Sequence, residues 1–165
     1  MSDTYDKLLA LLDRHGTSYR LIDHEAEGQT DKVSLLRGHP VEQAAKCIIL
    51  IAKIGKKVTR FVLAVVPGNM RVDTGRVRSL FNATYVGFAA ADVAERLAGS
   101  AAGTVLPIAF DPQLTLIADP GLLTHEEIFF NAARLDRSLA LRTADYQRLA
   151  NPRLETIALP DTTNP

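Results

Sequence analysis

Hydrophobic residues recur along the chain with two periods, and each period predicts a different kind of element. From Tyr5 to Leu12, apolar residues fall at i, i+3, i+4 and i+7, which is the spacing of one face of an amphipathic helix. Asp3 precedes this segment as a candidate N-cap, and Gly16 follows it as a candidate stop. The pattern therefore predicts a first helix over about 4–15.

The same two periods divide the rest of the chain into short helices and strands. Helical spacing with capping residues predicts further helices at about 30–38, 40–45, 73–81, 90–99 and 143–150. Thr30 and Thr143 are the expected caps of the first and last of these. Runs rich in β-branched and aromatic residues predict strands at about 18–23, 47–53, 58–66, 83–89, 114–118, 126–132 and 138–143. Because hairpins are mixed with helices, we expect an α+β fold.

The two longest predicted strands form the centre of this interpretation. The segments 47–53 and 58–66 are joined by Ile54-Gly55-Lys56-Lys57, a glycine-containing loop of the kind that closes a hairpin. Both strands are apolar at nearly every position, without the alternation of a strand that faces water on one side. We therefore expect a hairpin that is covered on both faces.

Length and composition bound the class of protein. A chain of 165 residues suits one compact domain, so we expect a single domain over 1–165 with a frayed tail from about 154 to 165. The hydrophobic fraction of 47% and the charged fraction of 23% are those of an ordinary globular protein. No apolar run could span a bilayer, the N-terminus does not resemble a signal peptide, and the single cysteine suits a reducing compartment. We expect a cytoplasmic protein with no membrane partner.

The signatures of several enzyme classes do not occur in the sequence. There is no GxSxG, no GxxxxGK[ST] and no GxGxxG, which removes the serine-hydrolase, P-loop and Rossmann interpretations. The four histidines are too far apart for a ligand pair, so we expect neither a metal nor a cofactor. Cys47 directly follows Lys46, and neighbours on a strand point to opposite faces, so we expect a buried and inert thiol.

Three features carry candidate chemistry, and each also has a purely structural interpretation. Lys46 stands at the head of an apolar strand without an obvious anion beside it, and it could equally snorkel to water. The segment Gly103–Pro107 could present backbone groups to a small ligand, or it could simply connect two elements. The segment 131–142, with its asparagine, aspartate and arginines, could bind a substrate or form a solvated hairpin rim.

Taken in order, these features resemble one known family. Lys46 before an apolar strand, the GxxxP loop from Gly103 to Pro107, and the segment FNAARLDRSLALRTADY are similar to the YbaK/prolyl-tRNA synthetase-associated (INS-like) editing domain family, closest to its YeaK branch. The resemblance spans about residues 4–151. It implies an α+β fold with a curved mixed, mostly antiparallel sheet and surrounding helices. It also implies a trans-acting deacylase that hydrolyses the ester between a wrong amino acid and the 3′ end of tRNA.

The resemblance further implies roles for individual residues. Lys46 would anchor a phosphate or ribose oxygen of the terminal adenosine, and backbone groups of the loop that begins at Gly103 would polarise the ester carbonyl. The attacking water would be oriented by those backbone groups or by the 2′-hydroxyl of the substrate, without a protein general base. Lys46 and Gly103 are thus the expected catalytic residues, and the expected substrate-binding residues are His24, Thr30, Thr104, Val105, Leu106, Pro107, Asn131 and Asp136.

The expected substrate is a tRNA mischarged with a small amino acid, with serine or threonine favoured over alanine or cysteine. Nineteen basic and nineteen acidic residues cancel, so tRNA binding needs a local basic patch drawn from Lys53, Lys56, Lys57, Arg60, Arg71, Arg76 and Arg78. A synthetase is a further candidate partner. Two other functions stay open: a module that binds aminoacyl-tRNA or a synthetase without hydrolysis, and a small-molecule ester hydrolase or nucleotide-binding protein.

Overall fold

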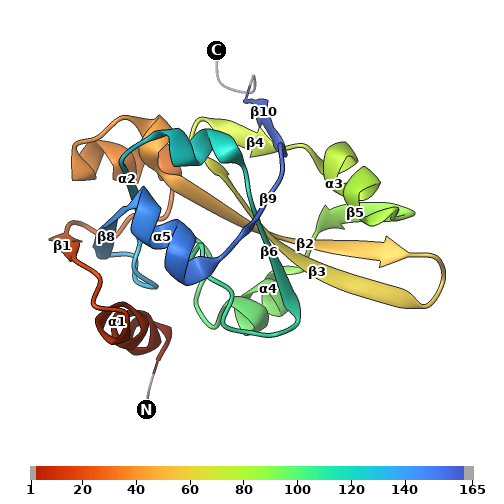
Figure 1. Cartoon of the computed structure of the whole chain (residues 1–165), viewed down its shortest axis with the longest axis horizontal. Helices are drawn as coiled ribbons and strands as arrows, with labels where there is room; N and C mark the ends of the chain where they lie inside the picture. Colours follow the sequence, from red (N-terminus) through yellow and green to blue (C-terminus); the bar gives the residue numbers. More distant parts are fainter. Residues whose placement is uncertain (1–2, 162–165) are drawn as a thin grey trace.

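The computed structural model describes residues 3–161 and has the predicted α+β fold (Figure 1). In this part of the chain the helices are α1 (Thr4–Arg14), α2 (Thr30–Arg37), α3 (Thr74–Phe81), α4 (Ala91–Ala98) and α5 (Thr143–Ala150), with 3-10 turns η1 (Val41–Gln43) and η2 (Pro120–Thr124). The strands are β1 (Tyr19–Asp23), β2 (Ala45–Ile54), β3 (Val58–Pro67), β4 (Met70–Val72), β5 (Tyr85–Phe88), β6 (Leu114–Ala118), β7 (Glu127–Asn131), β8 (Arg137–Arg142), β9 (Arg153–Leu154) and β10 (Ala158–Pro160). None of the described helices is long and apolar enough to cross a membrane.

The strands form a mixed, mostly antiparallel arrangement that is divided among three sheets. The largest sheet has the order β5-β2-β3-β6-β9, in which the β3–β6 and β6–β9 pairs are parallel. A second sheet has the antiparallel order β1-β8-β7, and β10 pairs with β4 in the third. A parallel bridge between Ala44 and Phe129 joins the start of β2 to β7.

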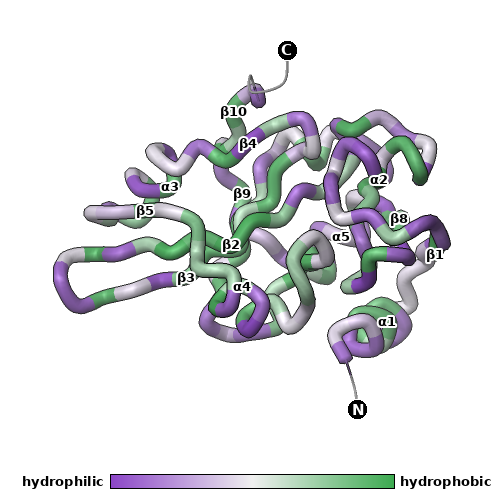
Figure 2. Tube along the Cα trace, turned by 180° about the vertical axis from the view of Figure 1, so that it is seen from behind, coloured by the Kyte–Doolittle hydropathy of each residue, from purple (hydrophilic) through white to green (hydrophobic). Residues whose placement is uncertain are grey.

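Both faces of the central sheet are covered, as its apolar strands predicted. The larger core includes Leu8 of α1, Leu97 of α4 and Tyr146 of α5, together with the inner residues of β7 and β8. The smaller core lies on the opposite face and includes Val77 of α3 and Ile157 near the C-terminus. Figure 2 shows hydrophobic residues concentrated along the central part of β2.

The hairpin of β2 and β3 is paired along its whole length but is only partly flanked by other strands. All ten residues of β2 pair with β3, from Ala45 opposite Pro67 to Ile54 opposite Val58. On the outer side, β5 pairs only with residues 50–53 of β2. The tip of the hairpin therefore projects from the body of the molecule (Figure 1). Between the bridge at Ala44 and the segment that pairs with β5, β2 has an open strand edge.

Two predicted N-caps were wrong, and one predicted helical turn is shorter than expected. The turn at 40–45 is present as the 3-10 turn Val41–Gln43, but it ends before Ala45, where β2 begins. Thr30 and Thr143 are each the first residue of a helix and do not act as N-caps. The Thr143 hydroxyl instead donates to the carbonyl of His125, so a tertiary contact uses the group that local capping would have used.

The C-terminal segment is ordered further than the sequence predicted. We expected fraying from about residue 154, but β9 and β10 are both formed, and β10 pairs with β4. The Ile157 side chain is fully buried, and the N–H groups of Ile157 and Ala158 both donate to Asp119 Oδ2 at 2.8 Å. Apolar burial and charge-assisted hydrogen bonds offset the lost chain entropy. The prediction was wrong through residue 160, and its last residues, 162–165, lie outside the described part of the chain.

Candidate active site

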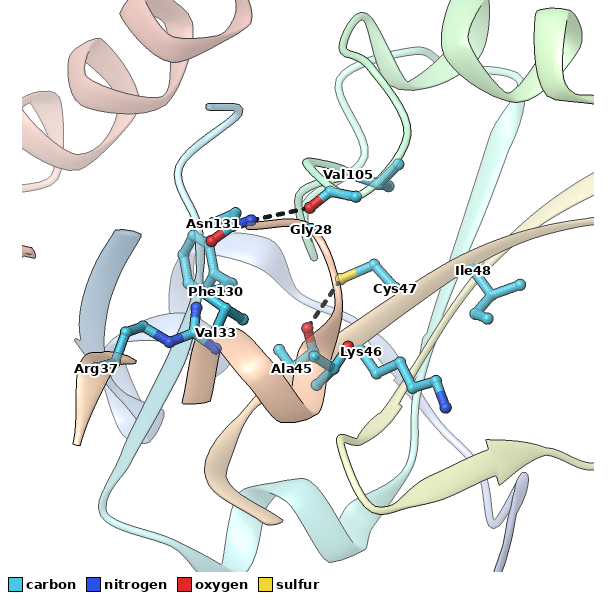
Figure 3. A pocket seen from close by; sticks show the side chains of 12 residues that line it. Gly28, Val33, Arg37, Ala45, Lys46, Cys47, Ile48, Val105, Phe130 and Asn131 are labelled. Atoms are coloured by element: carbon cyan, nitrogen blue, oxygen red, sulfur yellow. Dashed lines mark hydrogen bonds between the residues drawn. The ribbon is translucent and has the colours of Figure 1, made fainter. Parts of the chain in front are cut away.

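A pocket with a volume of about 180 Å³ lies beside the first residues of β2 (Figure 3). Its walls come from the segment that leads into α2, from β2, from the loop around Gly103 and from the end of β7. The lining residues are Gly28, Thr30, Val33, Arg37, Ala45, Lys46, Cys47, Ile48, Gly103, Val105, Phe130 and Asn131. The structure thus brings together residues from widely separated parts of the sequence.

The open edge of β2 brings backbone groups to this pocket. The carbonyl of Val65 accepts a hydrogen bond from Asp119 N–H at 2.9 Å, so the backbone polar groups of Val65 face away from β2. Cys47 is the residue opposite Val65, and in an antiparallel pair both members then turn their N–H and C=O groups away from each other. The N–H and C=O of Cys47 therefore lie on the strand edge that β5 leaves open.

Lys46 lines the pocket while its ammonium group lies across the strand from the Cys47 side chain (Figure 3). This follows from the alternation of side chains along a strand. The Nζ atom donates to the carbonyl of Met70 in β4 at 2.9 Å. No ion pair among the described residues includes Lys46. Because an ammonium group has three donors, Lys46 can still bind an oxygen ligand.

The thiol of Cys47 is held in its protonated form. Its Sγ atom donates to the carbonyl of Ala45 at 3.6 Å, and burial raises the pKa of the thiol. Because the thiolate is the reactive species, Cys47 is poorly suited to act as a nucleophile at neutral pH. The sequence predicted a buried and inert thiol, but Cys47 is only partly buried and lines the pocket.

The loop that begins at Gly103 approaches the segment before α2 at backbone distance. Gly103 has φ of +84°, and a Cβ atom at this position would lie 2.9 Å from the Cα atom of Gly28. The loop is closed by Thr104, whose N–H and hydroxyl both donate to the carbonyl of Ala101. Among the described residues, the N–H groups of Gly103 and Val105 have no hydrogen-bond partner. They are available to a ligand.

Asn131 ties this loop to the rest of the pocket. Its Nδ2 atom donates to the carbonyls of Glu27 at 2.9 Å and Gly103 at 3.0 Å. Its Oδ1 atom accepts from the hydroxyl of Ser138 at 2.9 Å. The side chain is buried, so these bonds fix the orientation of the amide and, through it, the position of Gly103.

Arg37 lines the pocket, although no sequence pattern indicated it. It is the last residue of α2, a position where arginine is common because it complements the helix dipole, so nothing in the pattern singled it out. Its Nε atom donates to His39 Nε2 at 2.9 Å, and its Nη1 atom donates to Ser138 Oγ at 3.1 Å. Burial lowers the pKa of Arg37 to about 10, so the guanidinium stays charged at neutral pH.

Five of the predicted substrate-binding residues do not line the pocket. Leu106 and Pro107 lie in the protein core, and the buried Thr104 closes the loop. His24 Nε2 bonds to Ser138 Oγ at 2.6 Å, and Ser138 in turn bonds to the lining residues Asn131 and Arg37. Asp136 is exposed and paired with Arg134 at 3.0 Å, and that ion pair lowers the pKa of the carboxyl group. The pocket itself contains Thr30, Val105 and Asn131 from the predicted set.

The lining residues also define the chemistry that the pocket can support. It contains no carboxylate and no imidazole; its ionisable side chains are Arg37, Lys46 and Cys47. The described part of the chain has no cluster of three or more histidine, cysteine or acidic residues that could hold a metal ion. The site therefore offers cationic donors and backbone N–H groups, which suit an oxygen-rich ligand.

Comparison with known proteins gives this pocket a context. A model of the aminoacyl-tRNA editing domain family matches residues 24–149. The chain is 37% identical over 154 residues to the multifunctional Ser/Thr-tRNA deacylase ProXp-y of Escherichia coli (strain K12), covering 93% of this chain and 92% of that protein. ProXp-y of Escherichia coli O157:H7 matches with the same identity and the same coverage of both chains.

Solved structures share the fold at lower sequence identity. The crystal structure of hypothetical protein APE2540 superimposes with a TM-score of 0.83 at 19% identity and covers 93% of this chain and 99% of its own. A candidate trans-editing enzyme for prolyl tRNA synthetase superimposes with a TM-score of 0.78 at 20% identity, covering 96% and 99%. The family match and the 37% identical relatives confirm the resemblance noted in the sequence: this chain belongs to the aminoacyl-tRNA editing domain family.

Proposed function

We propose that this protein is a trans-acting aminoacyl-tRNA deacylase that hydrolyses the ester of tRNA mischarged with serine or threonine. Membership of the editing domain family and similarity to a Ser/Thr-tRNA deacylase support the proposal. The observation that carries it is the pocket at the open edge of β2, where Lys46 and the loop at Gly103 converge. The substrate would be a tRNA in the cytoplasm, with a synthetase as a further candidate partner.

Lys46 would hold the terminal adenosine of the tRNA. Its ammonium group has a single neutral partner, the carbonyl of Met70, and no carboxylate of the described residues competes for it. A phosphate or ribose oxygen is the acceptor that a strongly hydrated, compact cation on a flexible stem would take up. In this role Lys46 positions the ester relative to the pocket and takes no part in proton transfer.

Backbone donors would polarise the ester carbonyl. The N–H groups of Gly103 and Val105 have no partner in the described chain, and the N–H of Cys47 lies on the open strand edge. Donors fixed in this way stabilise the negative charge that develops on the carbonyl oxygen during hydrolysis. Because the loop at Gly103 is held by Asn131, these donors need little reorganisation when the ester reacts.

The attacking water would be activated without a protein base. The pocket lining has no carboxylate or imidazole, and Cys47 is a protonated thiol. An aminoacyl ester is already activated, so a positioned water suffices, with the 2′-hydroxyl of the substrate as its hydrogen-bond partner. The volume of about 180 Å³ suits one small aminoacyl group, since pockets for drug-sized ligands start at about 300 Å³. Larger amino acids would be excluded by size.

A deacylation panel tests the proposal. One tRNA is charged in turn with Ser, Thr, Ala, Cys and Pro, and the rate of amino acid release is measured with the purified full chain. Turnover of Ser- and Thr-tRNA above the spontaneous rate is expected. Binding of aminoacyl-tRNA without turnover would favour the non-catalytic binding module. Equal turnover of a free aminoacyl ester that carries no tRNA would favour the small-molecule hydrolase.

A further inference from the structure

Arg37 is a partly buried cation with no anionic partner in the described chain. Its two side-chain partners are neutral: Ser138 Oγ, which accepts from Nη1 at 3.1 Å, and His39 Nε2, which accepts from Nε at 2.9 Å. His39 can accept because its Nδ1 atom lies 2.7 Å from the carbonyl of Pro40 and therefore carries the proton. Burying a charge without a counterion is costly, so an oxygen ligand is expected to complete this site.

The guanidinium has donors to spare on the pocket side. Of its five N–H groups, His39 and Ser138 each take one, and the described residues provide no acceptor for the rest. The Arg37 side chain reaches the pocket beside Val33 and Phe130, on the opposite side from the Lys46 ammonium group (Figure 3). Lys46 would hold the nucleotide end of the ligand, so Arg37 faces the opposite, aminoacyl end.

The chemistry of an aminoacyl ester limits what Arg37 can bind there. The α-carboxyl group is esterified and carries no charge, and the α-ammonium group would be repelled by a guanidinium. A serine or threonine side chain offers one remaining oxygen, its hydroxyl. Alanine, which is of similar size, offers none.

We propose that Arg37 is a specificity-determining residue that donates a hydrogen bond to the side-chain hydroxyl of the aminoacyl group. Val33 and Phe130 pack beside that group, and Ser138 and His39 hold the guanidinium in place. A site built to donate to a hydroxyl leaves a buried donor unpaired when the hydroxyl is missing, and this discriminates more strongly than size alone. The inference rests on the proposed deacylase function, since it names the substrate group that the same pocket reads.

The test compares kcat/KM for Ser-tRNA and Ala-tRNA, both prepared on one tRNA. Arg37→Met removes every donor but keeps the length of the side chain. It is expected to lower the Ser/Ala ratio of kcat/KM by about 10- to 100-fold, the effect of one charge-assisted hydrogen bond. Arg37→Lys keeps the charge without the planar fork and is expected to lower the same ratio by a smaller factor. Arg20→Met is the matched control, because Arg20 is exposed and paired with Glu127 outside the pocket.

The outcomes separate this inference from the proposed function. An equal fall for both substrates, or an unchanged ratio in either folded Arg37 variant, would overturn the role in specificity, because a phosphate contact or a structural role affects both esters alike. If Arg37→Met does not fold, Arg37→Lys decides the question by the same ratio. If the wild-type chain releases no amino acid from any tRNA, the proposed function fails instead.

Discussion

The backbones of Gly28 and Gly103 are in direct contact, and this contact joins the two loops that border the pocket. A Cβ atom on Gly103 would lie 2.9 Å from Gly28 Cα, closer than such atoms can approach. A Cβ atom on Gly28 would in turn lie 3.1 Å from the Leu135 side chain. Two glycines far apart in sequence thus let these loops pack together where both line the pocket.

Gly103→Ala is expected to reduce both stability and activity. Gly103 has φ of +84°, which costs a non-glycine residue roughly 1–2 kcal/mol, and the contact with Gly28 adds about 1–3 kcal/mol of overpacking. Gly55→Ala is the matched control, because Gly55 also has positive φ but has no atom near the added methyl group. Thermal unfolding of both variants should show the larger decrease for Gly103→Ala. Equal decreases would mean that the loop can move away from Gly28.

Lys46→Ala is expected to abolish deacylation and to leave the fold intact. The side chain makes one hydrogen bond, to the Met70 carbonyl, so its removal should cost little stability. Lys7→Ala on α1 is the control, because Lys7 is exposed and lies outside both the pocket and the candidate basic patch. The measurement is single-turnover release of amino acid together with far-UV circular dichroism. Near-normal turnover by Lys46→Ala would contradict the proposed mechanism.

The projecting hairpin tip is expected to contact the RNA. Lys56 and Lys57 are exposed there, beyond the residues that pair with β5. Replacing both with serine should raise KM at moderate salt and leave kcat unchanged. The slope of the logarithm of the tRNA association constant against the logarithm of the salt concentration should become shallower. The expected change is about 0.7–0.9 for each phosphate that the variant no longer neutralises. The double variant Lys7→Ser/Arg14→Ser on α1 serves as control, and the same salt slope in both would argue against RNA binding by the hairpin.

Acid is expected to destabilise the protein in part through His39. Burial lowers the pKa of His39 below its ordinary value of 6.5, and the Arg37 charge acts in the same direction. Between the lowered pKa and 6.5 the unfolded chain binds more protons than the folded chain, so stability is lost as pH falls through this window. His39→Gln keeps an acceptor for Arg37 but does not titrate, and should lose less stability between pH 7 and pH 5. Urea unfolding at each pH measures the free energy of unfolding. If this free energy falls equally with pH in the wild type and in His39→Gln, His39 is excluded as the cause.

Ile157→Ala is expected to destabilise the fold although the residue lies in the tail. Its side chain is fully buried in the smaller core, so truncation should cost about 2–5 kcal/mol. Leu154→Ala is the control, because Leu154 is 40% exposed in the same segment. Denaturant unfolding should separate the two variants. Similar small decreases would show that the tail contributes little to stability.

Local sequence patterns were sufficient wherever one element determines its own structure. The helical spacing from Tyr5 to Leu12 predicted α1, and Asp3 caps it by accepting from the N–H of Asp6 as expected. Asp73 caps α3 in the same way. The two long apolar strands form a hairpin that is covered on both faces over its inner part, while its tip projects. These features depend on neighbours within a few residues, which a single sequence contains.

The candidate site likewise contains residues that the sequence indicated and one residue that only the fold brings into place. Lys46, Asn131 and Gly103 of the GxxxP motif were singled out as candidate chemistry before the resemblance gave them roles, and the structure brings all three to one pocket. Pro107 was chosen from the same motif but lies in the core, where its carbonyl accepts from the Tyr146 hydroxyl at 2.7 Å. Arg37 was missed, because its neutral partners come from a distant strand and from a histidine with an ordinary sequence context.

The sequence by itself determined the α+β class, the central hairpin and the family, since these follow from periodicity and from motifs in a fixed order. Only the tertiary structure decided which polar groups of the described chain have no partner. The open edge at Cys47, the close approach of Gly28 and Gly103, and the partly buried charge of Arg37 all arise from the packing of segments far apart in the chain. No local pattern encodes them, because hydrogen bonding and burial are satisfied across the whole fold.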